Sequence, residues 1–154
     1  MKSIVLTAKS FSLLLIAALL LLAGCGNKNN PNPQNLYGNA ARPTWQVVEN
    51  PDMTASMTAV IQVKTLCDLA INDTVVGEKD VLAAFAGETC IGIAKYSEGL
   101  FFLYITGTEG NVSLRYYSAH YTNLFEAKDA FPFVNHTQKG TPDSPYLPSL
   151  GTIK

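Results

Sequence analysis

Hydrophobic and polar residues alternate along much of the chain beyond residue 45, which is the pattern of half-buried β-strands. Residues 57–64 alternate in this way, and so do residues 112–117. Successive side chains of a strand point to opposite faces of its sheet. In the second stretch we therefore expect the core to take Val112, Leu114 and Tyr116, and the outer face to take Ser113, Arg115 and Tyr117.

Short runs of this kind, separated by Gly, Asn and Asp turns, predict an all-β protein. The expected strands are 45–48, 57–64, 81–86, 89–96, 100–105, 112–117, 121–127 and 131–134. Gly87-Glu88 would close 81–96 into a tight hairpin. The only helical feature is a turn near 66–71. Seven to eight antiparallel strands predict a β-sandwich, with a small β-barrel as the alternative.

The N-terminus has a different pattern. An apolar run from Phe11 to Leu22 follows Lys2 and Lys9. A membrane-spanning helix needs roughly 20 such residues, so this shorter run with its basic flank matches a secretory signal. Residues 22–25, Leu-Ala-Gly-Cys, look like a bacterial lipobox. They predict cleavage before Cys25 and acylation of its thiol. The alternative is a non-lipidated secretory signal that happens to have a cysteine nearby.

Residues 26–44 are rich in Asn, Pro and Gly. They carry too little apolar surface to fold and predict a flexible tether. The chain would then consist of a signal peptide (1–24), a lipidated cysteine with its tether (25–44) and one β-sandwich domain (45–154).

The charge balance limits the classes of partner. The chain has 11 basic and 12 acidic residues, and cleavage of the signal would remove Lys2 and Lys9, leaving 9 basic residues (11 − 2). A slightly acidic domain does not fit a nucleic-acid binder, which depends on cationic contacts with phosphates.

Five segments carry a family resemblance: SMTAVI at 56–61, DVLAAFAGETCIGIA at 80–94, YITG at 104–107, VSLRYYSA at 112–119 and GTPDSPY at 140–146. Together the domain resembles a family of small domains in cell-envelope lipoproteins and secreted proteins of Bacteroidetes. The resemblance spans most of 45–147. It implies an immunoglobulin-like β-sandwich with a surface role, and it implies no reaction.

Cys67 and Cys90 are the two cysteines that remain once Cys25 is acylated. In an oxidising compartment an even pair predicts a disulfide. The bridge would close a loop of about 24 residues and contribute roughly 3 kcal/mol to stability. The alternative is two separately buried thiols.

The acidic residues do not predict a metal or catalytic site. Asp68, Asp73, Glu78, Asp80 and Glu88 gather around the first hairpin. They lack the regular spacing of a calcium loop and are interpreted as solvated charges. Neither Cys67 nor Cys90 lies in a nucleophile motif, so we expect no metal, no cofactor and no catalysis.

Aromatic residues give the one indication of a ligand. Tyr117 and Tyr121, with Arg115, could form an outer face that stacks on a sugar ring or packs against a partner protein. The alternative is aromatic pairing across strands that stabilises the sheet.

Asp73-Thr74-Val75 resembles an O-glycosylation acceptor of exported Bacteroidetes proteins, which makes Thr74 a candidate for modification.

Together these patterns predict a non-enzymatic binding module, anchored by lipid in the bacterial cell envelope at the surface or the periplasmic face of the outer membrane. It would assist adhesion or the binding of a glycan or an envelope protein. The alternatives are a small periplasmic hydrolase or inhibitor, and a structural envelope component.

Overall fold

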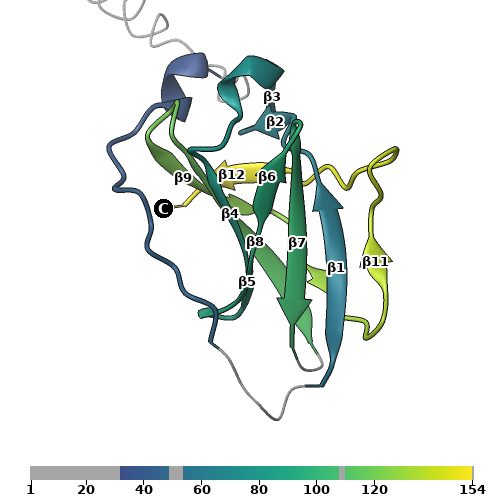
Figure 1. Cartoon of the computed structure of the whole chain (residues 1–154). Coiled ribbons are helices and arrows are strands. Elements are labelled where there is room, and N and C mark those ends of the chain that lie inside the picture. The colour runs from purple at the N-terminus through teal and green to yellow at the C-terminus, as the bar shows by residue number, and fades with distance from the viewer. Residues whose placement is uncertain (1–31, 49–53, 108–109, 154) are drawn as a thin grey trace, which may run out of the picture. The chain divides into compact units, whose positions relative to one another are not determined.

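The computed structural model describes residues 32–48, 54–107 and 110–153. The expected signal peptide and Cys25 lie outside these ranges. Within them the chain forms two β-sheets and no α-helix (Figure 1). None of the helical turns in these ranges could cross a membrane. The predicted all-β sandwich is confirmed, and the sheets do not close into a barrel.

The smaller sheet has four strands. Their order is β11 (Gln138–Lys139), β1 (Ser56–Ile61), β7 (Leu100–Thr106) and β6 (Lys95–Ser97). The pairs β1–β7 and β6–β7 are antiparallel, whereas β1 and β11 run parallel.

The larger sheet has eight strands. Their order is β3 (Leu69–Ala70), β2 (Thr65–Leu66), β12 (Leu150–Thr152), β9 (Asn123–Ala127), β8 (Asn111–Ser118), β4 (Val81–Ala86) and β5 (Thr89–Ile93), and β10 (Phe131–Pro132) pairs with β8. The pair β2–β12 is parallel, so both sheets are mixed rather than purely antiparallel as expected.

The core lies between the sheets and follows the period-two pattern of the sequence. Along β7, Phe101, Leu103 and Ile105 point inward and are buried. Across from them the inward residues of β8 are Val112, Leu114 and Tyr116, as predicted.

The expected single strand 89–96 is divided between the two sheets. Ala94 still donates its N–H to Leu82 of β4 (2.8 Å), but Lys95 already pairs with Phe102 of β7. The crossing requires a close approach, because a Cβ on Gly92 would lie 2.4 Å from the carbonyl oxygen of Tyr104. The two sheets are therefore joined through continuous backbone at this corner.

Residues 32–48 form what we call the N-terminal strap. It begins with a 3-10 helix, η2 (Pro33–Leu36), and continues as extended chain along the larger sheet (Figure 1). Leu36 is buried in the core, and Gly38 and Ala40 donate N–H groups to the carbonyls of Tyr121 and Thr122 (both 2.9 Å).

The strap corrects two predictions. Residues 32–44 are not a flexible tether, because they dock on the domain that was expected to begin at Trp45. Residues 45–48 are not a strand either, although Val48 donates to the carbonyl of Cys90 (3.0 Å). Low apolar content misled the interpretation because one buried leucine and a few backbone hydrogen bonds suffice to dock the segment.

Three further regions differ from expectation. The turn expected near 66–71 is the β2–β3 hairpin, and its tip residues Cys67 and Asp68 have positive φ. A second 3-10 helix, η3 (Asp73–Val75), follows it. The C-terminal tail supplies the short strands β11 and β12.

Candidate functional site

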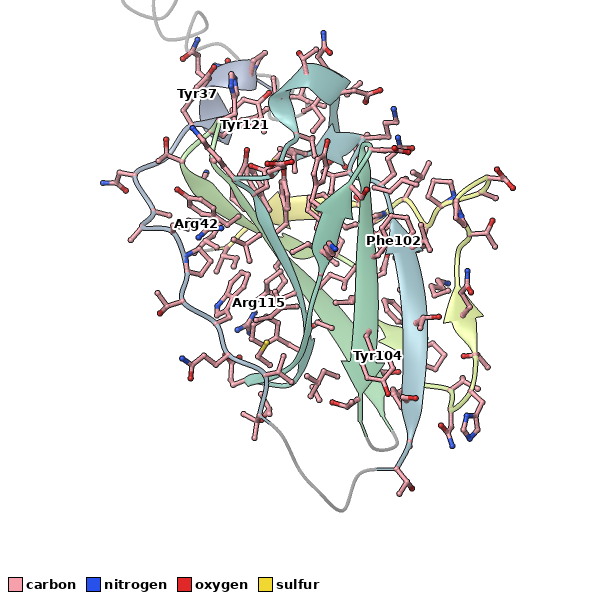
Figure 2. All side chains as sticks on the ribbon, viewed as in Figure 1. Tyr37, Arg42, Phe102, Tyr104, Arg115 and Tyr121 are labelled. Atoms are coloured by element: carbon pink, nitrogen blue, oxygen red, sulfur yellow. The ribbon has the colours of Figure 1, made fainter. Side chains whose placement is uncertain are left out.

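The outer face of the smaller sheet carries two exposed aromatic rings. Side chains of β7 alternate between the core and this face, which leaves Phe102 39% exposed and Tyr104 59% exposed. Residues two apart on a strand are about 7 Å apart on the same face. Figure 2 shows the two rings along β7. They form a short aromatic row open to solvent.

Strand register places specific neighbours beside each ring. Tyr104 lies opposite Thr58 of β1, and Thr58 in turn lies opposite Gln138 of β11. Phe102 lies between Val60 of β1 and Lys95 of β6. Side chains paired across strands share a face, so the rings are flanked by a hydroxyl, an amide and an ammonium group.

A groove of about 460 Å³ runs along this face, and we call it the aromatic groove. It is lined by Thr58, Ala59, Val60, Phe102, Leu103, Tyr104, Gln138 and Pro142. None of these side chains is a carboxylate, a thiol or an imidazole. The chemistry that they offer is stacking and hydrogen bonding.

The wall of the groove after β11 is fixed by backbone contacts. Tyr146 donates its N–H to Val60 (2.9 Å), and Gln62 donates to the carbonyl of Tyr146 (3.0 Å). Gly140 turns the chain with φ +74°, and a Cβ there would come within 2.5 Å of the carbonyl oxygen of Val60. The groove is thus formed before any ligand arrives, which lowers the entropy lost on binding.

The amide of Gln138 is oriented by the same turn. Its Nε2 donates to the carbonyl of Gly140 (2.8 Å). A glutamine amide has two N–H donors and one carbonyl acceptor, so Oε1 and the second N–H remain for a ligand. Thr58 is exposed and adds a hydroxyl between Gln138 and Tyr104.

The predicted aromatic face on the larger sheet does not form. Tyr117 points outward, as period two requires, but the strap runs along this face and Tyr117 is only 6% exposed. Tyr121 is also buried, in edge contact with Tyr37 of the strap (5.1 Å between ring centroids). Burial raises the pKa of Tyr121. Neither ring can stack on a ligand.

Arg115 is occupied by neighbouring groups. Its guanidinium makes a two-pronged ion pair with Glu88 (2.8 and 2.9 Å), contacts Glu126 (3.2 Å) and stacks over the ring of Phe85. Trp45 of the strap packs edge-on against the same ring. The hydrogen bond and charge of Arg115 lower the pKa of Glu88. Arg115 of β8 is therefore held by the β4–β5 turn and by β9 instead of facing a ligand.

The expected disulfide is absent, because both cysteines are free thiols. Cys67 lies at the tip of the β2–β3 hairpin and packs against the main core. Cys90 lies on β5 in a separate cluster with Ala83 and Phe85, on the strap side of the larger sheet. Burial raises the pKa of the Cys90 thiol.

The acids around the first hairpin are dispersed. Asp68 pairs with Lys128 and Asp73 with Lys64, so these carboxylates have cationic partners. Asp80 is buried beneath the β8–β9 turn, where it accepts three hydrogen bonds. Within the described ranges no three acids, histidines or cysteines are placed to hold a metal ion.

Thr74 is exposed on η3, where its backbone N–H donates to the side chain of Asn72 (3.0 Å). Its modification stays a prediction.

The aromatic groove was present in the sequence as the run Phe101-Phe102-Leu103-Tyr104. Neighbouring residues of a strand face opposite ways, so one residue of Phe101/Phe102 and one of Leu103/Tyr104 had to lie outside the core.

Comparison of the chain with protein-family models, curated proteins and solved structures gives no match. The geometry of the groove therefore carries the functional argument.

Proposed function

We propose that the chain is a lipid-anchored, non-catalytic binding module of the bacterial cell envelope and that it binds a glycan in the aromatic groove. The observation that carries this proposal is the exposure of Phe102 and Tyr104, side by side above a preformed groove. Large exposed apolar patches on monomeric proteins commonly mark interaction sites.

A glycan fits the mixture of groups that the groove presents. A sugar ring has C–H groups on one face and hydroxyls around its edge. The two rings offer flat apolar surfaces to the C–H groups, and Thr58 and Gln138 lie beside them with hydrogen-bonding groups for the hydroxyls. A few placed polar groups around an apolar floor are typical of small-ligand sites.

The anchor part of the proposal rests on the sequence. The short apolar run, the lipobox-like residues 22–25 and the cysteine itself support cleavage and acylation at Cys25. Many anchored copies on one membrane can bind a repetitive glycan with higher avidity than a single site provides. Modest affinity at each groove would then be sufficient.

The test is glycan-array binding followed by calorimetry with the mature protein. Tyr104→Ala should weaken binding about tenfold, equivalent to about 1.4 kcal/mol, which is within the range of aromatic contacts. Tyr104→Phe keeps the ring and should retain most of the affinity. Val134→Ala, which trims an exposed apolar side chain elsewhere, is the matched control.

Unchanged affinity in Tyr104→Ala would contradict the groove as the site. Binding to envelope proteins but to no glycan would contradict the ligand class. The anchor is checked separately by the intact mass of the protein from membranes. An unacylated N-terminus at Cys25, or membrane retention of a Cys25→Ser variant, would contradict it.

A further inference from the structure

The N-terminal strap shortens the predicted connection between Cys25 and the domain. The first residue that the structure describes is Asn32, seven Cα–Cα steps after Cys25. An extended chain covers at most about 3.6 Å per step, so this connection reaches about 25 Å. The tether predicted from the sequence, ending at Thr44, would have reached almost three times as far. The start of the strap must therefore lie close to an anchor at Cys25.

The start of the strap is fixed to one end of the sandwich. We call this the proximal end; it comprises η2, η3 and the β8–β9 turn at residues 119–122 (Figure 1). Asn123 donates its side-chain N–H to the carbonyl of Leu36 (3.0 Å), and Gly38 donates to the carbonyl of Tyr121. The first described residues of the chain therefore lie at this end of the domain.

An aromatic cluster lies at the point of exit. Tyr37 is 52% exposed and packs against Tyr121 and against His120 (ring centroids 6.0 Å apart). Its hydroxyl lies 3.5 Å from Nε2 of His120, which is itself exposed. Figure 2 shows Tyr37 and Tyr121 together at this end. The tyrosine ring is thus held in place with one side open to solvent.

We propose that the proximal end rests on the phospholipid headgroups of the membrane, with Tyr37 as its contact residue. This inference rests on the proposed lipid anchor. Rings with an apolar body and a polar tip are enriched at membrane–water interfaces. The exposed residues around Tyr37 are compatible with this position, since Gln34 and Asn35 are uncharged and Glu78 is followed by Lys79.

The arrangement also orients the aromatic groove. Strands β1 and β7 lie antiparallel along the length of the sandwich; β7 runs away from the proximal end and β1 runs toward it (Figure 1). With that end on the membrane, the groove opens sideways, parallel to the bilayer. A glycan chain lying along the membrane could then enter it without the domain turning over.

The experiment measures fluorescence quenching of the full lipidated protein in phosphatidylethanolamine–phosphatidylglycerol vesicles that carry brominated acyl chains. Tyr37→Trp places a probe at the proximal end. Val134→Trp places one on a residue of similar exposure (47%) that follows β10, beside the start of β8. The wild type, with Trp45 alone, supplies the background for both variants.

We expect brominated lipid to quench a larger fraction of the emission of Tyr37→Trp than of the wild type. The fraction quenched in Val134→Trp should not exceed that of the wild type. Equal quenching of the two variants, or none above background for Tyr37→Trp, would overturn the inference while leaving the anchor intact. If the mature protein is found to carry no acyl chain and does not sediment with vesicles, the anchor is contradicted and the inference falls with it. The intact mass also shows whether Thr74 carries a glycan. A glycan there would hold the proximal end away from the bilayer and would contradict the inference.

Discussion

The phenol of Tyr116 donates a 2.7 Å hydrogen bond to the carboxylate of Asp80, and both groups are buried. The same carboxylate accepts the backbone N–H groups of Ala119 (2.8 Å) and Gly77 (2.9 Å). One side chain at the start of β4 therefore fastens the end of β8 and the loop after η3. These are the segments that flank the proximal end.

Replacing this carboxylate should destabilise the domain. Asp80→Asn puts an amide N–H where three donors converge, and a buried unsatisfied donor costs about 1–3 kcal/mol. We expect a lower urea midpoint by equilibrium unfolding. Asp129→Asn, at an exposed position, is the control and should change stability by less than about 0.5 kcal/mol. Similar midpoints for the two variants would contradict the role given to Asp80.

Stability should also fall at alkaline pH because of Tyr116. Burial first, and then the charge of Asp80, raise the pKa of this phenol well above its usual range. In the unfolded chain a tyrosine titrates near pH 10. The contribution of Tyr116 is therefore complete below about pH 10 and is lost above it at about 1.4 kcal/mol per pH unit.

Urea unfolding across this pH range tests the linkage. Tyr116→Phe removes the titrating group and should show a shallower decline. Burial also raises the pKa values of Tyr121 and Tyr146, so the variant should keep part of the slope. Parallel curves for wild type and Tyr116→Phe would exclude Tyr116 as a source.

The strap should contribute measurably to stability. Leu36 is buried in the main core, and removing a buried leucine side chain typically costs about 2–5 kcal/mol. Leu36→Ala should therefore lower the unfolding free energy by about 3 kcal/mol. Leu147→Ala, on an exposed leucine, should be nearly neutral. A neutral Leu36→Ala would mean that the segment is a tether after all.

If Cys25 is acylated as proposed, two free thiols should be found in the mature protein. Thiol titration in urea without reductant is expected to give one equivalent each from Cys67 and Cys90. In the native state Cys67 should be alkylated first, because Cys90 is buried and its raised pKa leaves less reactive thiolate. No titratable thiol before reduction would establish the disulfide instead.

The sequence was a good guide where burial follows a local period. The inward set of β8 could be predicted because alternation directly reports which face is covered, and the strands 81–86 and 100–105 could be predicted from apolar runs bounded by turn residues. The strands β2, β3 and β11 could not, because each has only two residues and too few positions to show a period.

The candidate site was harder to predict because exposure of an outward residue depends on distant chain. Tyr117 and Tyr104 both point out of their sheets. The strap, 69 or more residues away in sequence, runs along the face of Tyr117, whereas Tyr104 stays open. Alternation gives the direction of a side chain, and tertiary packing decides whether solvent reaches it.

The strap also determines how the domain would respond to mechanical load. When a glycan held in the aromatic groove is pulled away from a membrane that holds the N-terminus, the tension enters the fold at η2. The contacts of Leu36, Gly38 and Ala40 would then break one after another, from the anchored end onward. Peeling residues 32–48 releases about 60 Å of chain. The sheets that form the groove would stay folded while this length is drawn out, so the strap would lengthen under load without disturbing a bound glycan.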